Sequence, residues 1–290
     1  MSFIPTISSL SQSANQPISV LGGGWVGLPL ARHLQAQGYE VGVSRTTTAG
    51  VSELSRLGLN AFAIQLAATD TLSDSPFWHA PTLLITVPPQ PGKPESEQLA
   101  QFGRLIERAR ASGVRQVLYI SSTSVYADDE QLATEDTAPA PTKPGGMLVY
   151  QLERLLQQEP AFRTTVLRFG GLIGYNRLPD NAAAIERRRR AIDTPMNVIH
   201  RDDCVRIIHE IVRQQAWGEV FNACADAHPT RRDYYAAAAR ARDFTLPDLG
   251  PSQPQPCKVV SSEKLKARLN YQFLFPNPLA IFEQPARDVL

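Results

Sequence analysis

The residues with the clearest chemical purpose are three glycines near the N-terminus. Gly22, Gly24 and Gly27 form the pattern GxGxxG directly after a short apolar run, and an amphipathic stretch follows them. At such a turn the first glycine allows a tight bend, the second lets a pyrophosphate approach the backbone, and the third lets the helix pack on the strand. The helix N-terminus offers amide groups and a positive dipole to phosphates. This context favours a dinucleotide site that includes Trp25 and Val26 over a glycine-rich turn without a ligand.

The residues after the second predicted strand bear on the choice of coenzyme. A site for NAD usually carries Asp or Glu about 20 residues after the glycine loop, bonded to the ribose 2′-hydroxyl. This chain has Ser44, Arg45, Thr46 and Thr47 there, with no carboxylate. A guanidinium pairs with a 2′-phosphate, and the hydroxyls add hydrogen bonds. We therefore expect NADP(H) as the cofactor rather than NAD(H). The alternative is that Arg45 is a solvated loop residue.

A second group of hydroxyl side chains follows a later predicted strand, over 117–121. The segment continues as Ser121, Ser122, Thr123 and Ser124. In a doubly wound sheet the carboxyl ends of the strands border the ligand crevice. A hydroxyl at this place can bond the oxygen of a carbonyl or alcohol substrate.

The order of the elements predicts the fold. Short apolar runs alternate with segments of helical periodicity, which is typical of a parallel sheet covered on both faces. The strands are expected at 18–21, 39–44, 61–66, 83–87, 117–121 and 164–169, and the helices at 26–37, 51–57, 97–111 and 147–158. The fold class is α/β, a doubly wound parallel sheet of the Rossmann type with a smaller C-terminal substrate lobe. We expect a flexible N-terminal extension over 1–17, a dinucleotide-binding domain over 18–170, and over 171–290 a lobe interleaved with the end of the main sheet.

Several motifs in this order resemble a known family. They are the glycine loop, the segment SSTSVY over 121–126, RFGGLIG over 168–174 and IHRDD over 199–203. Together they resemble extended short-chain dehydrogenases/reductases of the NAD-dependent epimerase/dehydratase group, over nearly the whole chain from Ile18. The resemblance implies a Rossmann domain with a substrate lobe and an alcohol or carbonyl substrate, often a nucleotide sugar. It also implies that Ser122 is the catalytic hydroxyl and that Val87 and Pro88 flank the cofactor.

The proton-transfer residues depart from the family pattern, which has a Tyr followed four residues later by a Lys. Here Tyr150 is followed by Arg154, whose planar guanidinium does not replace an ammonium in shape. A second register, counted back from Arg168 without gaps, puts Gly145 and Val149 at the two positions and leaves Tyr150 as a packing residue. The sequence is compatible with both registers.

Other polar clusters have simpler structural interpretations. His200 could pair with an aspartate in catalysis, but Asp202 or Asp203 is more simply the cap of a following helix. The run Arg187–Arg190 could clamp a diphosphate, but consecutive residues point to all faces of a helix, so a solvated helix is favoured. A solvated loop is favoured over a calcium site for Asp128, Asp129, Glu130, Glu135 and Asp136.

Composition excludes several classes of protein. The 290 residues carry 29 basic and 28 acidic side chains, so the charge gives no reason to expect nucleic acid or an anionic membrane. No apolar run approaches the roughly 20 residues of a membrane span. The three cysteines have neither disulfide-framework nor zinc-ligand spacing, and we expect no metal. The N-terminus lacks the pattern of a signal peptide, so a cytoplasmic location is expected.

These observations lead to two functional hypotheses. The first is an NADP(H)-dependent oxidoreductase or epimerase-like enzyme acting on an alcohol or ketone, with Ser122 polarising the oxygen and Tyr150, beside Arg154, exchanging the proton. The second is a protein that binds NADP(H) without turnover, as a redox sensor or regulatory partner. The expected partner is a small-molecule substrate, and a homodimer is left open.

Overall fold

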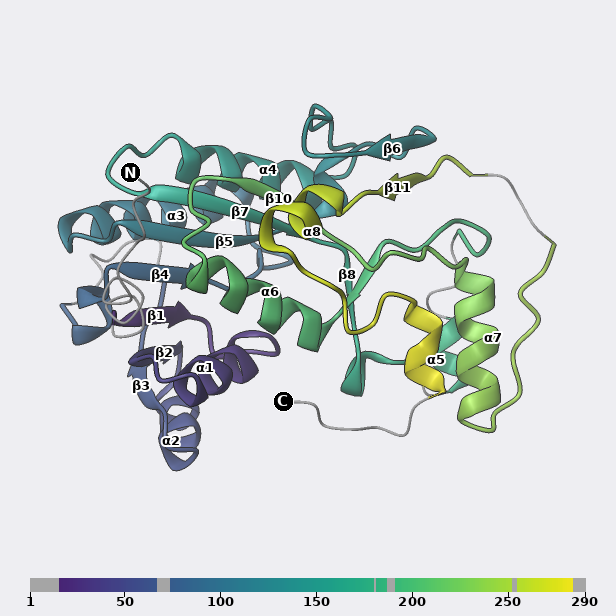
Figure 1. Cartoon of the computed structure of the whole chain (residues 1–290), viewed down its shortest axis with the longest axis horizontal. Coiled ribbons are helices and arrows are strands. Elements are labelled where there is room, and N and C mark those ends of the chain that lie inside the picture. The colour runs from purple at the N-terminus through teal and green to yellow at the C-terminus, as the bar shows by residue number, and fades with distance from the viewer. Residues whose placement is uncertain (1–15, 67–73, 180, 187–190, 252–254, 284–290) are drawn as a thin grey trace, which may run out of the picture. The chain divides into compact units, whose positions relative to one another are not determined.

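A computed structural model describes residues 16–66, 74–179, 181–186, 191–251 and 255–283 (Figure 1). Its central feature is a parallel sheet of seven strands in the order β10-β7-β5-β4-β1-β2-β3. The strands are β1 (Ile18–Leu21), β2 (Val41–Arg45), β3 (Asn60–Ala63), β4 (Thr82–Ile85), β5 (Gln116–Ser122), β7 (Arg163–Phe169) and β10 (Val220–Ala223). The chain runs from β1 towards β3 on one side and from β4 towards β10 on the other. The predicted doubly wound sheet is therefore confirmed, and its order reverses between β1 and β4, where such sheets bind ligands.

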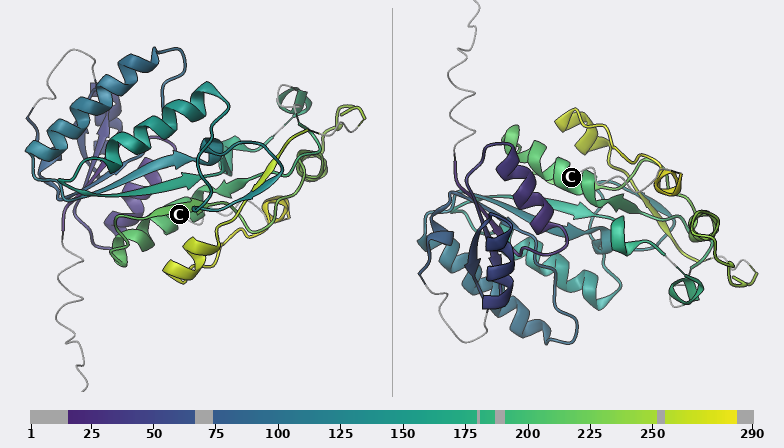
Figure 2. Two further views of the ribbon diagram at one scale, coloured as in Figure 1. Left: turned by 90° about the horizontal axis from the view of Figure 1, so that it is seen from above. Right: turned by 90° about the horizontal axis from the view of Figure 1, so that it is seen from below.

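Helices cover both faces of this sheet (Figure 2). Helix α1 (Gly27–Ala36) and the second half of α6 (Arg201–Arg213) lie on one face, where His33 Nε2 and His209 Nδ1 are 3.0 Å apart. Helices α3 (Glu95–Ala111) and α4 (Pro144–Gln157) lie on the other face, joined by a bond from Gln151 to Glu95. The short helix α2 (Thr48–Arg56) connects β2 and β3.

The buried core of the sheet explains why its strands appear as continuous apolar runs in the sequence. Strands β1 and β4 are buried at every position, as expected for parallel strands with both faces covered. The apolar side chains of β4 and β5 form one cluster with α3 and α4, which includes Leu83, Ile85, Val117, Tyr119, Phe102, Leu105, Leu148 and Leu152. A strand of continuous apolar residues needs such cover on both sides.

The chain divides into two compact units. The first comprises Met1–Ser121, Leu148–Leu167 and Ile207–Val220, and the second comprises Ser122–Met147, Arg168–Arg206 and Phe221–Leu290. The second unit contains two small parallel sheets, one of β6 (Gln131–Ala133) with β11 (Lys258–Val260) and one of β8 (Gly171–Ile173) with β9 (Val198–His200). The side-chain amide of Asn197 donates to Lys258 O at 2.9 Å and accepts from Val260 N at 2.8 Å.

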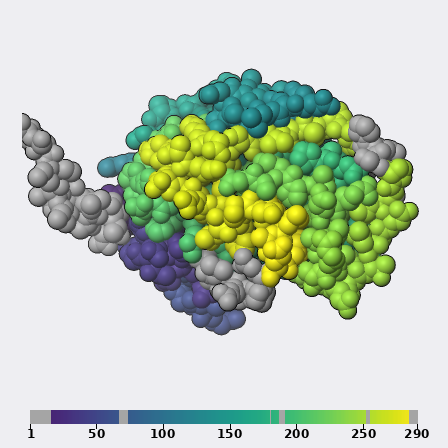
Figure 3. All heavy atoms as spheres, turned by 45° about the vertical axis from the view of Figure 1, so that its right-hand side comes forward, coloured from purple at the N-terminus to yellow at the C-terminus, as the bar shows by residue number. Residues whose placement is uncertain are grey.

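Helices and turns complete the second unit. They are α5 (Ala182–Glu186), α7 (Arg231–Ala241), α8 (Glu263–Leu269) and the 3₁₀ turns η4 (Thr123–Val125), η5 (Tyr175–Arg177) and η6 (Pro278–Phe282). Turn η6, in the yellow C-terminal segment, packs against α7 (Figure 3). Thr230 begins α7 with a capping box, in which its side chain and that of Asp233 each accept from the other's backbone.

Some local predictions differ from the structure, and others cannot be compared with it. Helix α2 begins at Thr48, earlier than the predicted Val51, because the Thr47 hydroxyl accepts from Gly50 N and caps it. The acidic segment predicted as a solvated loop contains β6, and α4 begins at Pro144, earlier than the predicted Met147. The run Arg187–Arg190 lies outside the described residues, as do residues 1–15 of the predicted extension.

Candidate cofactor site

The glycine loop after β1 has the geometry that its sequence predicts. Gly22 adopts φ +104°, a conformation that favours glycine, and the chain turns sharply there. A Cβ on Gly27 would lie 2.0 Å from the carbonyl oxygen of Gly22, so only glycine lets the helix approach this closely. Gly24 is exposed, and a Cβ on it would meet nothing within 4 Å. The loop therefore packs tightly at its two ends and leaves room at its middle.

The start of helix α1 is compatible with a phosphate. The helix begins at Gly27 with the buried Val26 as its N-cap, and no acidic side chain lies in its first turn. Trp25 is half-buried beside it. An N-terminus that carries no negative charge favours an anion through its amide groups and dipole. Together with the room at Gly24, these features fit the pyrophosphate of a dinucleotide.

Ser44 supports the loop from the neighbouring strand. Its side chain is buried, its hydroxyl accepts from Gly22 N at 2.9 Å, and its carbonyl accepts from Gly23 N at 2.7 Å. The sequence placed Ser44 among the groups that contact the coenzyme. In the structure its hydroxyl holds the backbone of the loop, and a contact with the coenzyme stays a prediction.

Arg45 and the threonines after it lie at the carboxyl end of β2. The guanidinium of Arg45 is 31% exposed and lies 4.0 Å from the Glu53 carboxylate. Its Nε has no hydrogen-bond partner among the described residues. Thr46 is exposed, and Thr47 is occupied as the cap of α2. The end of β2 thus presents one accessible cation and one accessible hydroxyl.

The turn after β4 lies against the same loop. A side-chain methyl of Val87 lies 2.7 Å from where a Cβ on Gly22 would be, and Thr86 Oγ1 lies 2.6 Å from the Gly22 carbonyl oxygen. Pro88 follows on the exposed side. Val87 therefore lies beside the glycine loop, and contact of Val87 and Pro88 with a cofactor stays a prediction. Thr86 was not singled out from the sequence.

The end of β5 carries the predicted catalytic hydroxyl. Ser122 is half-buried, and its Oγ accepts from Ser124 N at 3.1 Å as the cap of η4. Because this contact uses a lone pair, the hydroxyl proton stays available for an oxygen acceptor. The preceding Ser121 points elsewhere, since its buried hydroxyl donates to the fully buried carboxyl of Glu153.

Helix α4 presents different residues to the core and to solvent. Val149 and Glu153 are buried, Tyr150 is half-buried and Arg154 is exposed. Residues four apart share a face of a helix, so Val149 and Glu153 form the face that packs on the sheet. Arg154 lies on the exposed side and is not buried beside Tyr150. In the register through Gly145 and Val149, the residue at the Lys position is the buried Val149. In the register through Tyr150, the residue at the Lys position is the exposed Arg154.

Glu153 is a residue that the sequence analysis missed. A carboxylate normally needs a partner when it is fully buried, and Ser121 supplies one. Burial raises the pKa of the Tyr119 hydroxyl, and the charge of Glu153 raises it further. The available signal was a glutamate at an apolar position of the helical pattern, four residues after Val149.

His200, Asp202 and Asp203 hold elements of the second unit by hydrogen bonds, but neither aspartate caps the helix as predicted. Helix α6 begins at Arg201, so both aspartates lie inside its first turn and neither is the cap. His200 takes that place, because its Nδ1 accepts from Asp202 N at 3.3 Å. Asp202 accepts from the Tyr175 hydroxyl at 2.8 Å. Asp203 accepts from the backbone of the C-terminal segment, at Leu274 N and Phe275 N, and from the Tyr271 hydroxyl.

Burial shifts the proton equilibria of this cluster in opposite directions. Desolvation lowers the pKa of His200 to about 4, so the ring is neutral near pH 7. Desolvation raises the pKa of Asp203 to about 6, although its three hydrogen bonds act against the shift. The His200 ring also packs on Phe275 with centroids 3.9 Å apart. These contacts describe an anchor for the segment over 271–275.

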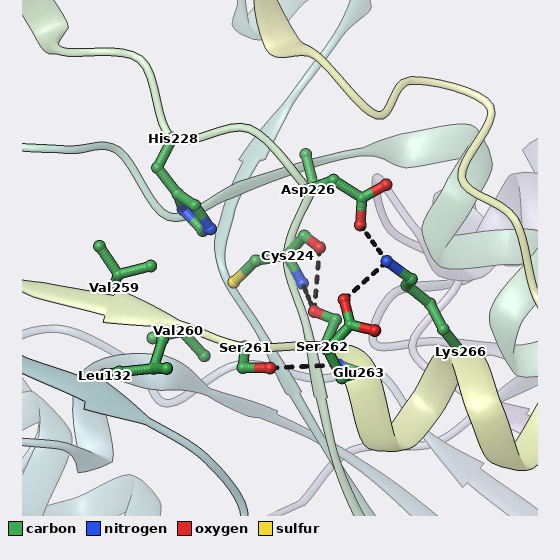
Figure 4. Close-up of a pocket in the computed structure, with 11 residues that line it drawn as sticks. Leu132, Cys224, Asp226, His228, Val259, Val260, Ser261, Ser262, Glu263 and Lys266 are labelled. Atoms are coloured by element: carbon green, nitrogen blue, oxygen red, sulfur yellow. Dashed lines mark hydrogen bonds and ion pairs between the residues drawn. The ribbon is translucent and has the colours of Figure 1, made fainter.

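A separate cavity of about 240 Å³ lies in the second unit (Figure 4). The Lys266 ammonium there lies between the carboxylates of Asp226 and Glu263, at 2.8 and 2.7 Å. The lining residues are Leu132, Cys224, Ala225, Asp226, His228, Val259, Val260, Ser261, Ser262, Glu263 and Lys266. None of the residues predicted to bind cofactor or substrate lines this cavity.

The acidic loop after β5 is tied down by ion pairs. Asp128 bonds Lys143 at 3.0 Å and Lys258 at 2.6 Å. Burial alone would raise the pKa of the Asp128 carboxyl, but these two cations outweigh it and lower the pKa. Glu135 accepts from Asn222 N at 2.7 Å. These two acids are therefore held by groups of the protein instead of being solvated, as the sequence had suggested.

No helix within the described part of the chain is both long and apolar enough to cross a membrane.

Known proteins resemble the chain over most of its length. Protein YeeZ of Escherichia coli (strain K12) is 28% identical over 269 residues, which cover 91% of this chain and 98% of that protein. A functionally unknown conserved protein from Silicibacter pomeroyi has a structure with a TM-score of 0.73 at 23% identity, covering 92% of this chain and 97% of that one.

An enzyme of known activity shares the fold. The UDP-glucose 4-epimerase of Thermus thermophilus, solved in complex with NAD, has a TM-score of 0.70 at 17% identity, covering 93% of this chain and 100% of that one. At such identities the structures show the fold alone. A protein-family model gives the assignment, because it matches residues 18–224, which is more than half of the chain. The chain therefore belongs to the NAD dependent epimerase/dehydratase family.

Proposed function

We propose that this protein binds NADP(H) on the loop after β1 and uses it to oxidise or reduce an alcohol or ketone, with a nucleotide sugar as one candidate substrate. The observation that carries the proposal is the combination of a glycine loop open at Gly24 with an accessible guanidinium at the end of β2, on Arg45. Both lie in the first unit. When bound, the nicotinamide supplies the hydride transfer.

The residues divide the remaining work. Gly22, Gly24 and Gly27, with the amides at the start of α1, would hold the pyrophosphate. Arg45 and Thr46 would bind the 2′-phosphate, because a guanidinium forms charge-assisted bonds with a phosphate. Ser122 would donate its hydroxyl proton to the substrate oxygen and orient it.

Coenzyme choice is tested by titration calorimetry of the purified protein with NADPH and with NADH. We expect tighter binding of NADPH, and we expect Arg45→Ala to remove the difference by weakening NADPH alone. A bond to a charged group is worth about 1.5–3 kcal/mol, which corresponds to roughly a 10- to 150-fold change in Kd. Arg56→Ala is the matched control, because Arg56 is an exposed arginine at the other end of α2. Equal or tighter binding of NADH by the natural protein would overturn the NADP(H) assignment.

Catalysis is tested with bound NADPH and a panel of nucleotide sugars, aldehydes and ketones. We expect Ser122→Ala to abolish any turnover found. Tyr150→Phe separates the two registers of α4, since it keeps activity if Tyr150 is a packing residue and loses it if Tyr150 exchanges the proton. Leu155→Met is a control for the helix, because Leu155 is a half-buried apolar residue of the same element.

A second function has a specific observation in its favour. The buried face of α4 carries Val149 and Glu153, and Arg154 is exposed, so the helix does not present the Tyr and Lys pair of the family. A protein that holds NADP(H) without turnover, as a sensor or regulatory partner, needs no such pair. NADPH that remains reduced and bound through the whole substrate panel would favour this second function.

A further inference from the structure

Two hydroxyl groups hold the glycine loop from opposite sides. Strand β1 lies between β2 and β4 in the sheet, and the loop leaves from its carboxyl end. From β2, Ser44 Oγ accepts from Gly22 N at 2.9 Å. From the turn after β4, Thr86 Oγ1 lies 2.6 Å from Gly22 O and 3.0 Å from Leu21 O. The amide and the carbonyl of Gly22 are thus both held by side chains.

The contact with Thr86 fixes an oxygen on which the rest of the turn depends. The Gly22 carbonyl accepts from Gly24 N at 2.8 Å as well as from the Thr86 hydroxyl. It also lies directly under Gly27, where any Cβ would be 2.0 Å away. A carbonyl oxygen has two lone pairs, and both have donors here. Its direction therefore sets the positions of Gly24 and of the first residue of α1.

The backbone alone does not enforce this direction. Glycine at φ +104° has neighbouring conformations of similar energy, because it has no side chain to restrict it. Without Thr86, the carbonyl of Gly22 could rotate towards the solvent side of the loop. A carbonyl that points outward would place its negative end towards an incoming phosphate.

We infer that Thr86 is a positioning residue for the coenzyme, which acts with Ser44 to keep the Gly22 carbonyl turned inward so that the loop meets the pyrophosphate with its amide groups. The inference rests on the proposed coenzyme binding for its functional part. It adds that the affinity for both coenzymes depends on a hydroxyl at position 86, since NADP and NAD have the same pyrophosphate.

The variant Thr86→Val removes the hydroxyl and keeps the shape of the side chain. We expect it to raise the Kd of NADPH and of NADH by the same factor, about tenfold, which corresponds to about 1.4 kcal/mol. Thr86→Ser restores the hydroxyl, and we expect it to bind within about twofold of the natural protein. Arg45→Ala should instead weaken NADPH alone, which distinguishes a contact with the 2′-phosphate from the geometry of the loop.

The matched control is Thr82→Val. Thr82 is a buried threonine at the other end of β4, where its hydroxyl lies 3.3 Å from the Gln116 side chain and not near the loop. It removes the same group from the strand that leads into Thr86, so it measures any general loss of stability. If Thr82→Val weakened both coenzymes as much as Thr86→Val does, the specific role of Thr86 would be refuted.

A measurement without coenzyme separates this inference from the proposed function. Amide hydrogen exchange of the free protein, followed by NMR at Gly22, Gly23 and Gly24, reports the order of the loop itself. We expect Thr86→Val to speed exchange at Gly24 at least about tenfold, because its acceptor is no longer held, and Thr86→Ser not to. Unchanged exchange in Thr86→Val would overturn the inference even if the protein binds NADPH. If the natural protein bound neither coenzyme, the proposed function would fail and so would the coenzyme role of Thr86, whatever the exchange rates.

Discussion

Two glycines of the same loop should respond differently to replacement by alanine: only one of the two variants should lose stability. In Gly27→Ala, the new Cβ would lie 2.0 Å from the Gly22 carbonyl oxygen, whereas ordinary contact starts at 3.4 Å. Helix α1 and strand β1 must therefore separate by more than 1 Å, or the loop must rearrange. Overpacking of this kind costs about 1–3 kcal/mol. In Gly24→Ala the new Cβ meets nothing within 4 Å, and Gly24 is not among the glycines with positive φ.

We expect both variants to lose affinity for NADPH, and Gly27→Ala alone to lose stability. Urea unfolding should show that Gly27→Ala lowers the free energy of unfolding by about 2 kcal/mol. Gly24→Ala should stay within about 0.5 kcal/mol of the natural protein. Calorimetry should show that both variants bind NADPH at least about tenfold more weakly, since the methyl on Gly24 occupies the space through which the pyrophosphate approaches the backbone. If Gly24→Ala bound NADPH as tightly as the natural protein, the open middle of the loop would not be the phosphate site.

Two further predictions concern the second unit. The pKa of Asp203 is raised to about 6, so its contribution to stability is complete below pH 3.8 and is lost as pH rises through 6. The pKa of His200 is lowered to about 4, so its contribution to stability is complete above pH 6.5 and is lost as pH falls through 4. Between these pH values the two residues change the stability in opposite directions. Unfolding in urea between pH 4 and 6.5 should therefore show a steeper rise of stability with pH in Asp203→Asn than in the natural protein, and a parallel rise in both would contradict the assignment. Thr230→Ala removes the hydroxyl of the capping box and should lower the free energy of unfolding by about 1 kcal/mol. Thr194→Ala, which removes a local hydrogen bond to Ala191, is the control. Equal losses of stability in the two variants would show that the capping box contributes nothing of its own.

The central sheet could be predicted from the sequence because its signals are local. The apolar runs at β1 and β4 are buried on both faces, and the glycine loop lies between a strand and a helix. These features depend on neighbours within a few residues, which a single sequence displays. The tight fit of Gly27 against Gly22 could also be predicted locally, because the third glycine of the motif is the one that lets the helix pack on the strand.

What the sequence did not reveal depends on partners far along the chain. Strand β6 has three residues inside a Pro-rich segment and exists because it pairs with β11, so its own pattern is too short to predict it. Glu153 is fully buried and its carboxyl accepts from Ser121, which lies 32 residues earlier in the chain. The hydroxyl of Ser44 bonds the amide of Gly22, a contact between neighbouring strands that the sequence alone does not show.

The helix start at Arg201 shows a third kind of difference. Aspartate is a common cap, which favoured Asp202 or Asp203 on propensity alone. The structure uses both carboxylates for distant partners, Tyr175 and the segment over 271–275, and the ring of His200 takes the capping role. Tertiary contacts thus override the local preference of aspartate for the capping position.

The Asn197 amide has a consequence for how this protein behaves in a crowded solution. An exposed strand edge offers unpaired backbone groups to any other extended chain, and such edges are starting points for aggregation. By bonding Lys258 O and Val260 N, Asn197 occupies the sites on β11 that an intruding strand would use. One side chain thus imitates a neighbouring strand, and replacement by leucine would leave that edge available to self-association.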